Sequence, residues 1–427
     1  MFHRKHGFDI VIANPPYLSH DRIAEEKTAL RNAFSVYDSF ADVYCYFIER
    51  GINILRHNGV LTFITSNSYI KADYGAKVRR YLSSCTRIAA LLNMEQSQVF
   101  EAAIVNVAVL VTSKTRPAAS DITRATNASW NSGSFNQFVR SEGFDLPTCE
   151  FNSPLWTLAG AEVLAVRTKI EAAGKSLKSR GAKIRLGVAT GHNGAFLVDT
   201  SVKRSLVKMD KSNAEIIVGV IRGRDIDRYK YIEPKLHLIA AKNGINIKRD
   251  YPTIFRHFES FGQSFKTRGA QGQHWWNLRA CNFYEDFDYE RIVWIELSDR
   301  ARFTTCPAGV WCLNTAYFML PPAEYAPNFL LGVLNSRVID FYFRLIAQTS
   351  GMGVPRWFNV YVEKFPVPTL ALEKQKSLGR LVDRILAAKQ RDADADTSAW
   401  DREIDQLVYA LYGLTPEEIK IVEGANK

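Results

Sequence analysis

The tetrapeptide Asn14-Pro15-Pro16-Tyr17 carries the clearest chemistry in the sequence, and it directly follows the apolar run Phe8–Ala13. The prolines fix φ and restrict the residue before each, so the Asn14 side-chain oxygen and the Pro15 carbonyl become rigid hydrogen-bond acceptors. Two such acceptors can bind both N–H bonds of an exocyclic aromatic amine and pull its nitrogen toward tetrahedral geometry. Tyr17 can stack on the ring. The pattern is typical of a loop that binds an aromatic amine and activates its nitrogen for nucleophilic attack, although Asn and Pro are also ordinary turn residues.

The residues around this loop predict alternating strands and helices. Strands are expected at Phe8–Ala13 and Gly59–Thr65, helices at Ser39–Leu55 and Gly75–Cys85, and a pair of apolar runs at Arg87–Asn93 and Val105–Thr112. Ligands bind at the carboxyl ends of strands in a doubly wound sheet, so Asn14 and Thr65-Ser66-Asn67 are expected on one rim. The first region is therefore predicted to be α/β.

A nucleotide-type cofactor normally lies on a Gly-rich turn after an early strand, with an acidic residue at the end of the next strand. No strand is predicted before Phe8, and the Gly-containing pieces Gly187–Gly191 and Gly351–Gly353 are expected to be loops. The main cofactor-binding motifs are thus expected to be absent from this sequence.

Length and charge limit the possible domain organisation and partners of the chain. With 427 residues it is too long for one core, which suggests two or three domains. The net charge is +11, and residues 181–312 contribute most of it, with 21 Lys+Arg against 14 Asp+Glu. A polyanion would be held there. The six cysteines include no Cys-x-x-Cys pair, so neither a metal site nor a disulfide framework is expected. No run suggests a membrane span or a signal peptide, and a cytoplasmic location is expected.

Four regions follow from these patterns: 1–115 with the Asn-Pro-Pro-Tyr loop, 116–180 as a Ser/Thr/Asn-rich connection with a helix, 181–370 as a second domain, and 371–427 as helices. In the second domain, Arg222 and Arg224 lie on a Gly turn and could reach phosphates or guanine edges. The aromatic pair Trp275 and Trp276 is more typical of a core than of a base-stacking surface.

The order of motifs resembles the gamma-class adenine-N6 DNA methyltransferases of restriction–modification systems. In the first half the resemblance rests on Asn14–Tyr17, Phe63–Tyr69 and Val99-Phe100-Glu101. In the second half it is to their TaqI-like specificity domain, and it rests on Thr190–Phe196, Ile221–Ile226, Leu334-Asn335-Ser336 and Glu403–Tyr409. The resemblance implies a partial Rossmann-like methyltransferase sheet, then an α+β target-recognition domain, then C-terminal helices.

The same resemblance implies roles for individual residues. Asn14, Pro15, Pro16 and Tyr17 would be catalytic, Asn14 would also lie near the methyl group of S-adenosylmethionine, and Phe100 would pack on the other face of a flipped adenine. Double-stranded DNA is the expected partner, together with a separate polypeptide that carries the S-adenosylmethionine-binding half. Two alternatives stay open: a non-catalytic DNA-binding module or truncated remnant, and a methyltransferase acting on RNA or protein.

Overall fold

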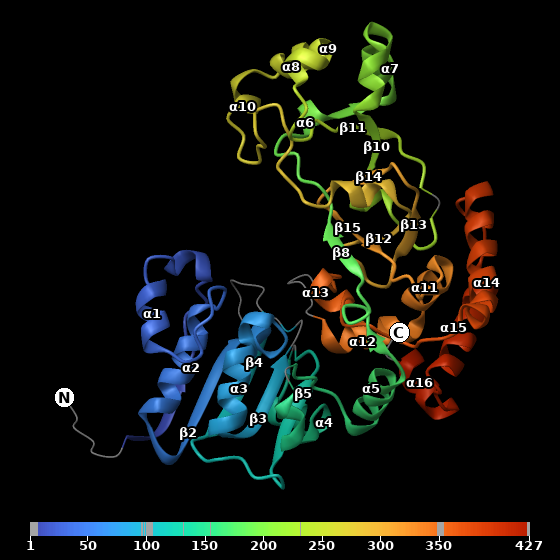
Figure 1. The fold of residues 1–427 in the computed structure, drawn as a ribbon. Helices are drawn as coiled ribbons and strands as arrows, with labels where there is room; N and C mark the ends of the chain where they lie inside the picture. The colour runs from blue at the N-terminus through green and yellow to red at the C-terminus, as the bar shows by residue number, and fades with distance from the viewer. Residues whose placement is uncertain are drawn as a thin grey trace. The chain divides into compact units, whose positions relative to one another are not determined.

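The computed structural model describes residues 7–94, 97, 99, 106–130, 132–153, 155–230, 232–347 and 354–424. It divides into two compact units (Figure 1). Unit 1 comprises Met1–Thr168 and Arg344–Arg356, and unit 2 comprises Lys169–Phe343 and Trp357–Lys427. Among the described residues, no helix has the length and apolar composition needed to cross a membrane.

Unit 1 is built on a six-stranded mixed sheet. Its strands, in spatial order, are β1 (Phe8–Ala13), β2 (Leu55–Ser66), β4 (Val107–Ser113), β3 (Arg87–Met94), β5 (Ile122–Asn127) and β6 (Phe144–Pro147). β1 runs parallel to β2, and β3 runs parallel to β5, while β4 is antiparallel to both of its neighbours. The predicted strands and the predicted pairing of the two apolar runs are confirmed.

Helices cover one face of this sheet (Figure 1). They are α1 (Lys27–Ala33), α2 (Val43–Ile54) and α3 (Ala76–Cys85), and the last two confirm the predicted helices. Tyr44 and Ile48 of α2 and Leu82 of α3 are fully buried against strand residues such as Phe63 and Leu110. This apolar cluster fixes the strands and hence the rim on which Asn14 lies.

Residues 122–147, which the sequence suggested to be part of a connection, instead extend the sheet by β5 and β6. Thr123, Ala125 and Thr126 are buried in β5, and the hydroxyl of Thr123 donates to the Ile88 carbonyl at 2.6 Å. Threonine is β-branched and packs well in strands, so a Thr-rich stretch that resembles a linker by composition can still form a strand. The segment also contains α4 (Phe135–Ser141), followed by α5 (Ala161–Ala173).

Unit 2 contains two four-stranded sheets with a helical insertion. One sheet has the order β14 (Trp311–Cys312), β10 (Ile217–Ile221), β11 (Leu236–Ile239), β9 (Leu197–Asp199). The other has the order β13 (Phe303–Cys306), β12 (Arg291–Ile295), β15 (Ala316–Leu320), β8 (Lys183–Leu186). The helices α6 (Asn193–Phe196), α7 (Thr200–Met209), α8 (Ile247–Asp250), α9 (Pro252–Glu259) and α10 (Gly262–Lys266) pack with these strands around one aromatic-rich core.

The remaining helices of unit 2 are α11 (Pro327–Leu334), α12 (Arg337–Ile346), α13 (Asn359–Val362), α14 (Leu372–Arg391), α15 (Ser398–Leu411) and α16 (Pro416–Gly424), and a short pair joins β7 (Lys175–Ser176) to β16 (Pro366–Val367). The expected C-terminal helices are confirmed. At the start of α16, Glu418 N donates to Thr415 Oγ1 at 3.3 Å and Thr415 N donates to the Glu418 carboxylate at 2.7 Å, a capping box.

Candidate active site and nucleic-acid interface

The Asn-Pro-Pro-Tyr loop begins where β1 ends. Ala13 lies opposite Phe63 in the parallel pair, so Asn14 comes level with the last residues of β2. This register brings Asn14 and the Thr65-Ser66-Asn67 stretch to one rim, as the sequence predicted. The side chain of Asn14 is exposed, whereas Pro15 is buried. The Asn14 amide is therefore accessible to a ligand, and the buried proline holds the loop rigid. Binding an amine in a fixed geometry requires both properties.

Tyr17 anchors the other end of the loop. Its hydroxyl donates to the Ile64 carbonyl at 3.4 Å, and burial raises the pKa of Tyr17 to about 12. The phenol therefore stays protonated at neutral pH and acts as a hydrogen-bond donor. Because the bond ties the loop to β2, the ring is held next to the rim.

An apolar cluster underlies Tyr17. Met94, Val107 and Phe138 are its buried members, and the partly buried ones are Tyr17, Ile64, Val99, Val109, Ala128, Trp130, Phe135 and Val139. Trp130 makes an edge-to-face contact with Phe135, with ring centroids 5.3 Å apart. The sequence analysis missed Trp130, because it lies in the segment interpreted as a connection. The sequence feature that could have indicated it is an isolated tryptophan among Ser, Thr and Asn residues.

Side-chain amides link three strand ends along the same rim. Asn67 donates to Asn93 Oδ1 at 2.9 Å, and Asn93 in turn donates to Asn127 Oδ1 at 2.6 Å. Only 3% of Asn93 is exposed, so its amide needs both partners. The chain of amides fixes the ends of β2, β3 and β5 relative to one another. Phe100, the predicted second stacking residue, lies outside the described residues.

In unit 2, the two predicted arginines differ in their surroundings. Arg222 binds Asp225 through Nε and Nη2, at 2.9 and 3.0 Å, and the Asp225 carboxylate also accepts from the Arg222 backbone N–H at 2.8 Å. These hydrogen bonds raise the pKa of Arg222. Arg224 is exposed, and within the described ranges it makes no hydrogen bond or ion pair. Of the two, Arg224 presents its guanidinium to solvent and hence to a ligand.

Exposed cations also lie on the helical insertion of unit 2. They are Arg204 and Lys208 on α7, Lys248 on α8, Arg256 on α9, and Arg279 in the loop that follows Trp276. Arg249 on α8 is exposed as well, but its guanidinium is paired with Asp250 at 2.6 and 3.0 Å. This distribution agrees with the charge excess found in the sequence. A surface of this kind attracts a polyanion such as nucleic acid.

Trp275 and Trp276 belong to the packing of this insertion. Both are partly buried against the core of unit 2, and both rings contact Phe255, at centroid distances of 5.6 and 5.5 Å. Beneath them, Arg268 is 7% exposed and donates to the carbonyls of Thr190 and Phe265 at 3.1 and 3.2 Å, and to those of Trp275 and Asn277. The aromatic pair thus belongs to the packed core of the insertion, as the sequence suggested.

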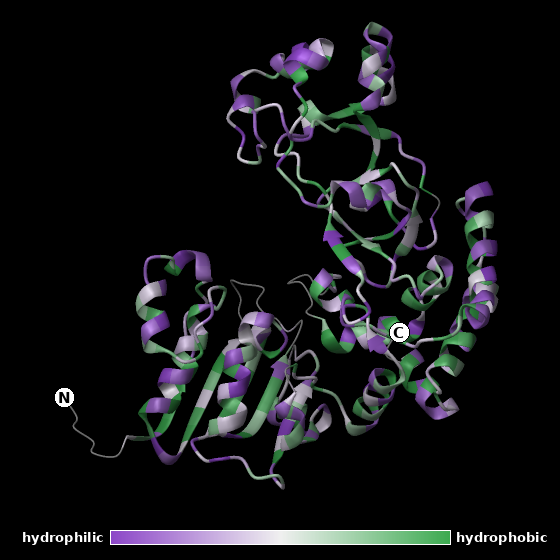
Figure 2. Cartoon of the chain, in the orientation of Figure 1, coloured by the Kyte–Doolittle hydropathy of each residue, from purple (hydrophilic) through white to green (hydrophobic). Residues whose placement is uncertain are grey.

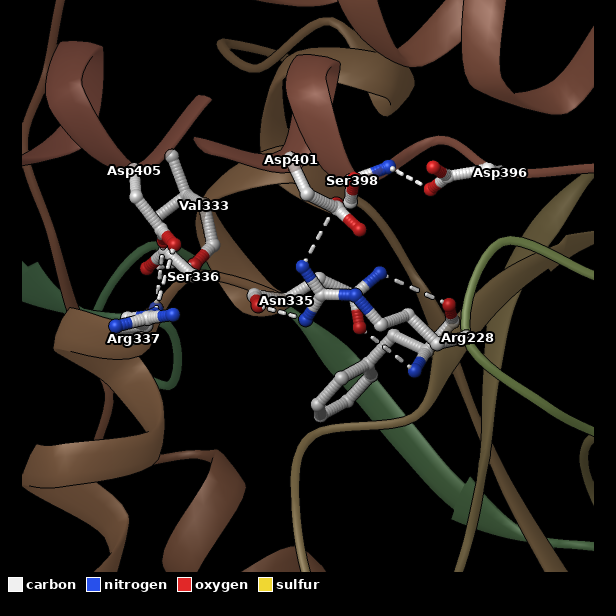
Figure 3. Close-up of polar contacts among 10 residues, drawn as sticks. Arg228, Val333, Asn335, Ser336, Arg337, Asp396, Ser398, Asp401 and Asp405 are labelled. Atoms are coloured by element: carbon white, nitrogen blue, oxygen red, sulfur yellow. Dashed lines mark hydrogen bonds and ion pairs between the residues drawn. The ribbon is translucent and has the colours of Figure 1, made fainter. Parts of the chain in front are cut away.

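Two motifs that are far apart in the sequence meet in unit 2 (Figure 3). Arg228 donates to the Asn335 carbonyl and, at 2.8 Å, to Asp401 on α15. Arg337 N donates to Asp405 at 2.9 Å. Asn335 pairs with both backbone groups of Phe303 at 3.0 Å. The Leu334-Asn335-Ser336 and Glu403–Tyr409 motifs therefore join the C-terminal helices to the strands of unit 2 and have a structural role.

The fold and the rim define a class: an α/β unit of methyltransferase type that carries an Asn-Pro-Pro-Tyr loop at the end of a strand, followed by a second unit with exposed cations. Residues 1–100 match the family model of the Eco57I restriction-modification methylase, and residues 218–367 match that of the TaqI-like C-terminal specificity domain. The chain is therefore homologous to type II restriction–modification methyltransferases and combines a DNA methyltransferase region with a specificity domain.

Individual relatives align over nearly the whole chain. Type II methyltransferase M.BstVI from Geobacillus stearothermophilus is 21% identical, with 98% of this chain and 75% of the relative covered. M.XhoI from Xanthomonas vasicola is 25% identical, with 98% and 77% covered. Among solved structures, the type IIL restriction-modification enzyme MmeI in complex with DNA superposes with a TM-score of 0.66 at 13% identity. That match covers 98% of this chain but only 56% of MmeI, and it concerns the fold.

Proposed function

We propose that this chain forms the acceptor-binding and DNA-recognition part of a site-specific adenine-N6 DNA methyltransferase. It would transfer a methyl group from S-adenosylmethionine to an adenine flipped out of duplex DNA, in the cytoplasm, as part of a restriction–modification or phage-defence system. The observation that carries the proposal is the exposed Asn14 amide at the end of β1, on a loop fixed by the buried Pro15 and by Tyr17.

The loop would activate the amine by geometry. The N6 lone pair of adenine is delocalised into the ring, so the nitrogen attacks a methyl group poorly until its N–H bonds are held out of the base plane. Asn14 Oδ1 and the Pro15 carbonyl would accept those two N–H bonds. Tyr17 would stack on one face of the base and Phe100 on the other. Stacking and hydrogen bonding would offset the few kcal/mol, roughly, that flipping requires.

S-adenosylmethionine would supply an electrophilic methyl group. Asn14 is the one residue of this chain that we assign near that methyl group. We assign no residue to the adenosine or amino-acid part of the cofactor, and we include in the proposal a second polypeptide that holds them.

Recognition of the DNA would fall to unit 2. The exposed cations of its helical insertion would bind phosphates and position the duplex, and Arg224 would bind a phosphate or a guanine edge. A second unit with this excess of cations is more than a methyltransferase of small targets needs, which favours DNA over a free amine or a short peptide.

The substitution Asn14→Ala tests the proposal. It removes one of the two acceptors, so we expect methylation of adenine in duplex DNA to fall below detection in the reconstituted enzyme. DNA affinity should change less than twofold, because Asn14 is uncharged and is assigned no phosphate contact. The readouts are N6-methyladenine by mass spectrometry and duplex binding by fluorescence anisotropy. Methylation retained at the wild-type rate would refute the acceptor role. A chain that binds DNA but never methylates it, in any reconstitution, would favour a non-catalytic binding module.

A further inference from the structure

A short loop in the helical insertion of unit 2 exposes two polar side chains to solvent. Gln271 and Leu278 lie opposite each other in an isolated antiparallel bridge and close this loop, which comprises residues 272–277. Gln273 and His274 are exposed, whereas the three residues that follow them are partly or fully buried. The second half of the loop therefore anchors it to the insertion, and the first half is accessible to a ligand.

Asn277 holds the backbone of the loop. This residue is fully buried, and its Nδ2 donates to the Lys242 carbonyl at 2.9 Å while its Oδ1 accepts from the His274 backbone N–H at 3.1 Å. The Asn277 backbone N–H donates in turn to the His274 carbonyl at 2.9 Å. The backbone N–H of Gln273 donates to Asn243 Oδ1 at 2.7 Å. These hydrogen bonds use only the backbone of Gln273 and His274, so they do not engage either side chain.

Two further features make the loop rigid. A Cβ atom at Gly272 would lie 2.2 Å from Asn243 Oδ1 and 2.2 Å from the Leu278 carbonyl oxygen, so this close approach requires glycine. The buried guanidinium of Arg268 donates through Nη2 to the Asn277 carbonyl at 2.5 Å. A loop that is fixed at several backbone positions is preorganised, so a ligand loses little binding energy in ordering it.

The ring of His274 is oriented although it is exposed. It stacks on Trp276, with ring centroids 4.5 Å apart and planes inclined by 26°. Trp276 is fixed in turn by an edge-to-face contact with Phe255, at a centroid distance of 5.5 Å. An imidazole ring carries at least one N–H donor in both its neutral and its charged form. Stacking therefore presents that donor in a defined orientation.

Positive charges lie close to this loop. Lys266 Nζ is 5.0 Å from the ring centroid of Trp275, and Lys248 Nζ is 5.9 Å from that of Phe255, whose ring contacts both tryptophans. Arg279, just after the loop, is exposed. Figure 2 shows hydrophilic residues along α8, the helix that carries Lys248. Cations of this kind hold and position a phosphate backbone, whereas side chains such as glutamine read the base edges beside it.

We propose that Gln273 and His274 read base edges in the major groove of duplex DNA. Gln273 binds an adenine by two hydrogen bonds: its Oε1 accepts from N6–H and its Nε2 donates to N7. His274 donates a ring N–H to N7 of a purine in the adjacent base pair. The inference rests on the proposed function and deepens it, because it names residues that select the recognition sequence. The loop lies within residues 218–367, the region that matches the TaqI-like specificity domain.

The experiment measures which sequences the full chain selects from a library of duplex DNA with a randomised segment. Bound duplexes are separated by electrophoretic mobility shift and sequenced for the wild-type chain and for Gln273→Ala, His274→Ala and Gln273→Arg. Gln390→Ala is the control, because Gln390 is also an exposed glutamine of unit 2 but lies near the end of α14. The replaced side chains do not hold the loop, so the variants should stay folded, and circular dichroism checks this.

We expect the wild-type chain and Gln390→Ala to select the same motif. Gln273→Ala should lose the preference for A·T at one base pair by roughly 5- to 150-fold, the discrimination of one bidentate contact, and keep the rest of the motif. His274→Ala should lose the preference for a purine at the adjacent base pair. Gln273→Arg should change the preferred pair from A·T to G·C, because a guanidinium donates to both O6 and N7 of guanine.

Each of the following results would overturn the proposal: an unchanged motif in either alanine variant of the loop, an A·T preference retained in Gln273→Arg, the same loss in Gln390→Ala, a loss at every position together, or a wild-type chain that selects no motif. N6-methyladenine measured on the same duplexes with the reconstituted enzyme keeps the two proposals apart. A motif that depends on Gln273 but is never methylated would refute the proposed function alone. Methylation within a motif that Gln273→Ala leaves unchanged would refute the role of the loop alone.

Discussion

Arg222 and Arg224 are separated by one residue, yet the structure gives them different roles, so replacing each by alanine should change different properties. The guanidinium of Arg222 makes two charge-assisted hydrogen bonds to Asp225, and the two side chains are 31% and 32% exposed. After discounting for solvent, Arg222→Ala should destabilise unit 2 by about 1 kcal/mol. For a unit of this size that corresponds to roughly 2–4 °C in the midpoint of thermal unfolding.

Arg224→Ala should instead leave stability within about 0.5 kcal/mol of the wild type, since the side chain is exposed and makes no hydrogen bond or ion pair to the described residues. If Arg224 binds a phosphate, its loss should reduce the slope of log affinity against log salt by about 0.9 for every duplex sequence. If it binds a guanine edge, the loss should be about 1–3 kcal/mol for the cognate site alone.

The assay is fluorescence anisotropy of a labelled duplex between about 50 and 200 mM salt, the range over which phosphate contacts have a large effect. Differential scanning calorimetry of the same preparations gives the stability. An Arg224→Ala chain with wild-type affinity and salt slope would refute the interface. So would an Arg222→Ala chain that keeps its stability but loses DNA binding, because the ion pair with Asp225 would then not be the main role of Arg222.

Three further substitutions test other parts of the structure. Tyr17→Phe keeps the ring and removes the hydroxyl, which donates to the Ile64 carbonyl at 3.4 Å, so it should change stability by less than about 1 kcal/mol. Tyr17→Ala removes the ring as well, so it should cost about 2 kcal/mol of stability and lower methylation by the roughly 1–3 kcal/mol of a stacking contact. Equal effects of the two substitutions in chemical denaturation and methylation assays would contradict this. Arg268→Met should destabilise unit 2 by about 3 kcal/mol or more in urea unfolding, because it leaves buried carbonyls without a donor. Lys266→Met is the control, and a smaller effect of Arg268→Met than of the control would argue against a structural role of Arg268. Burial raises the pKa of Asp405 to about 6. The native state then holds a proton that the unfolded state releases above about pH 4, so stability should fall by up to about 3 kcal/mol as pH rises from 4 to 6. Asp405→Asn should flatten this component, and an unchanged difference between urea unfolding at pH 4 and at pH 7 would refute it.

Local sequence determined the elements that surround the candidate site. The apolar run Phe8–Ala13 and the apolar spacing in Gly75–Cys85 predicted a strand and a helix that the structure confirms. The position of Asn14 on the rim also followed, because a parallel α/β arrangement fixes which ends of the strands meet. These properties depend on periodicity within a few residues and on chain order, and a single sequence contains both.

Tertiary structure alone decided which residues surround the Asn-Pro-Pro-Tyr loop and which of the two predicted arginines is paired with a carboxylate. Trp130 comes close to Tyr17 because β5 and α4 pack beside β3 and β4, and local composition carries no information about such long-range packing. Arg222 and Arg224 look alike in sequence, but only Arg222 has a carboxylate within hydrogen-bonding distance. The exposure of Phe8, Ile10 and Ile12 on β1 could not be predicted either. An apolar strand is expected to be buried, but its burial depends on what packs against it and not on its own sequence.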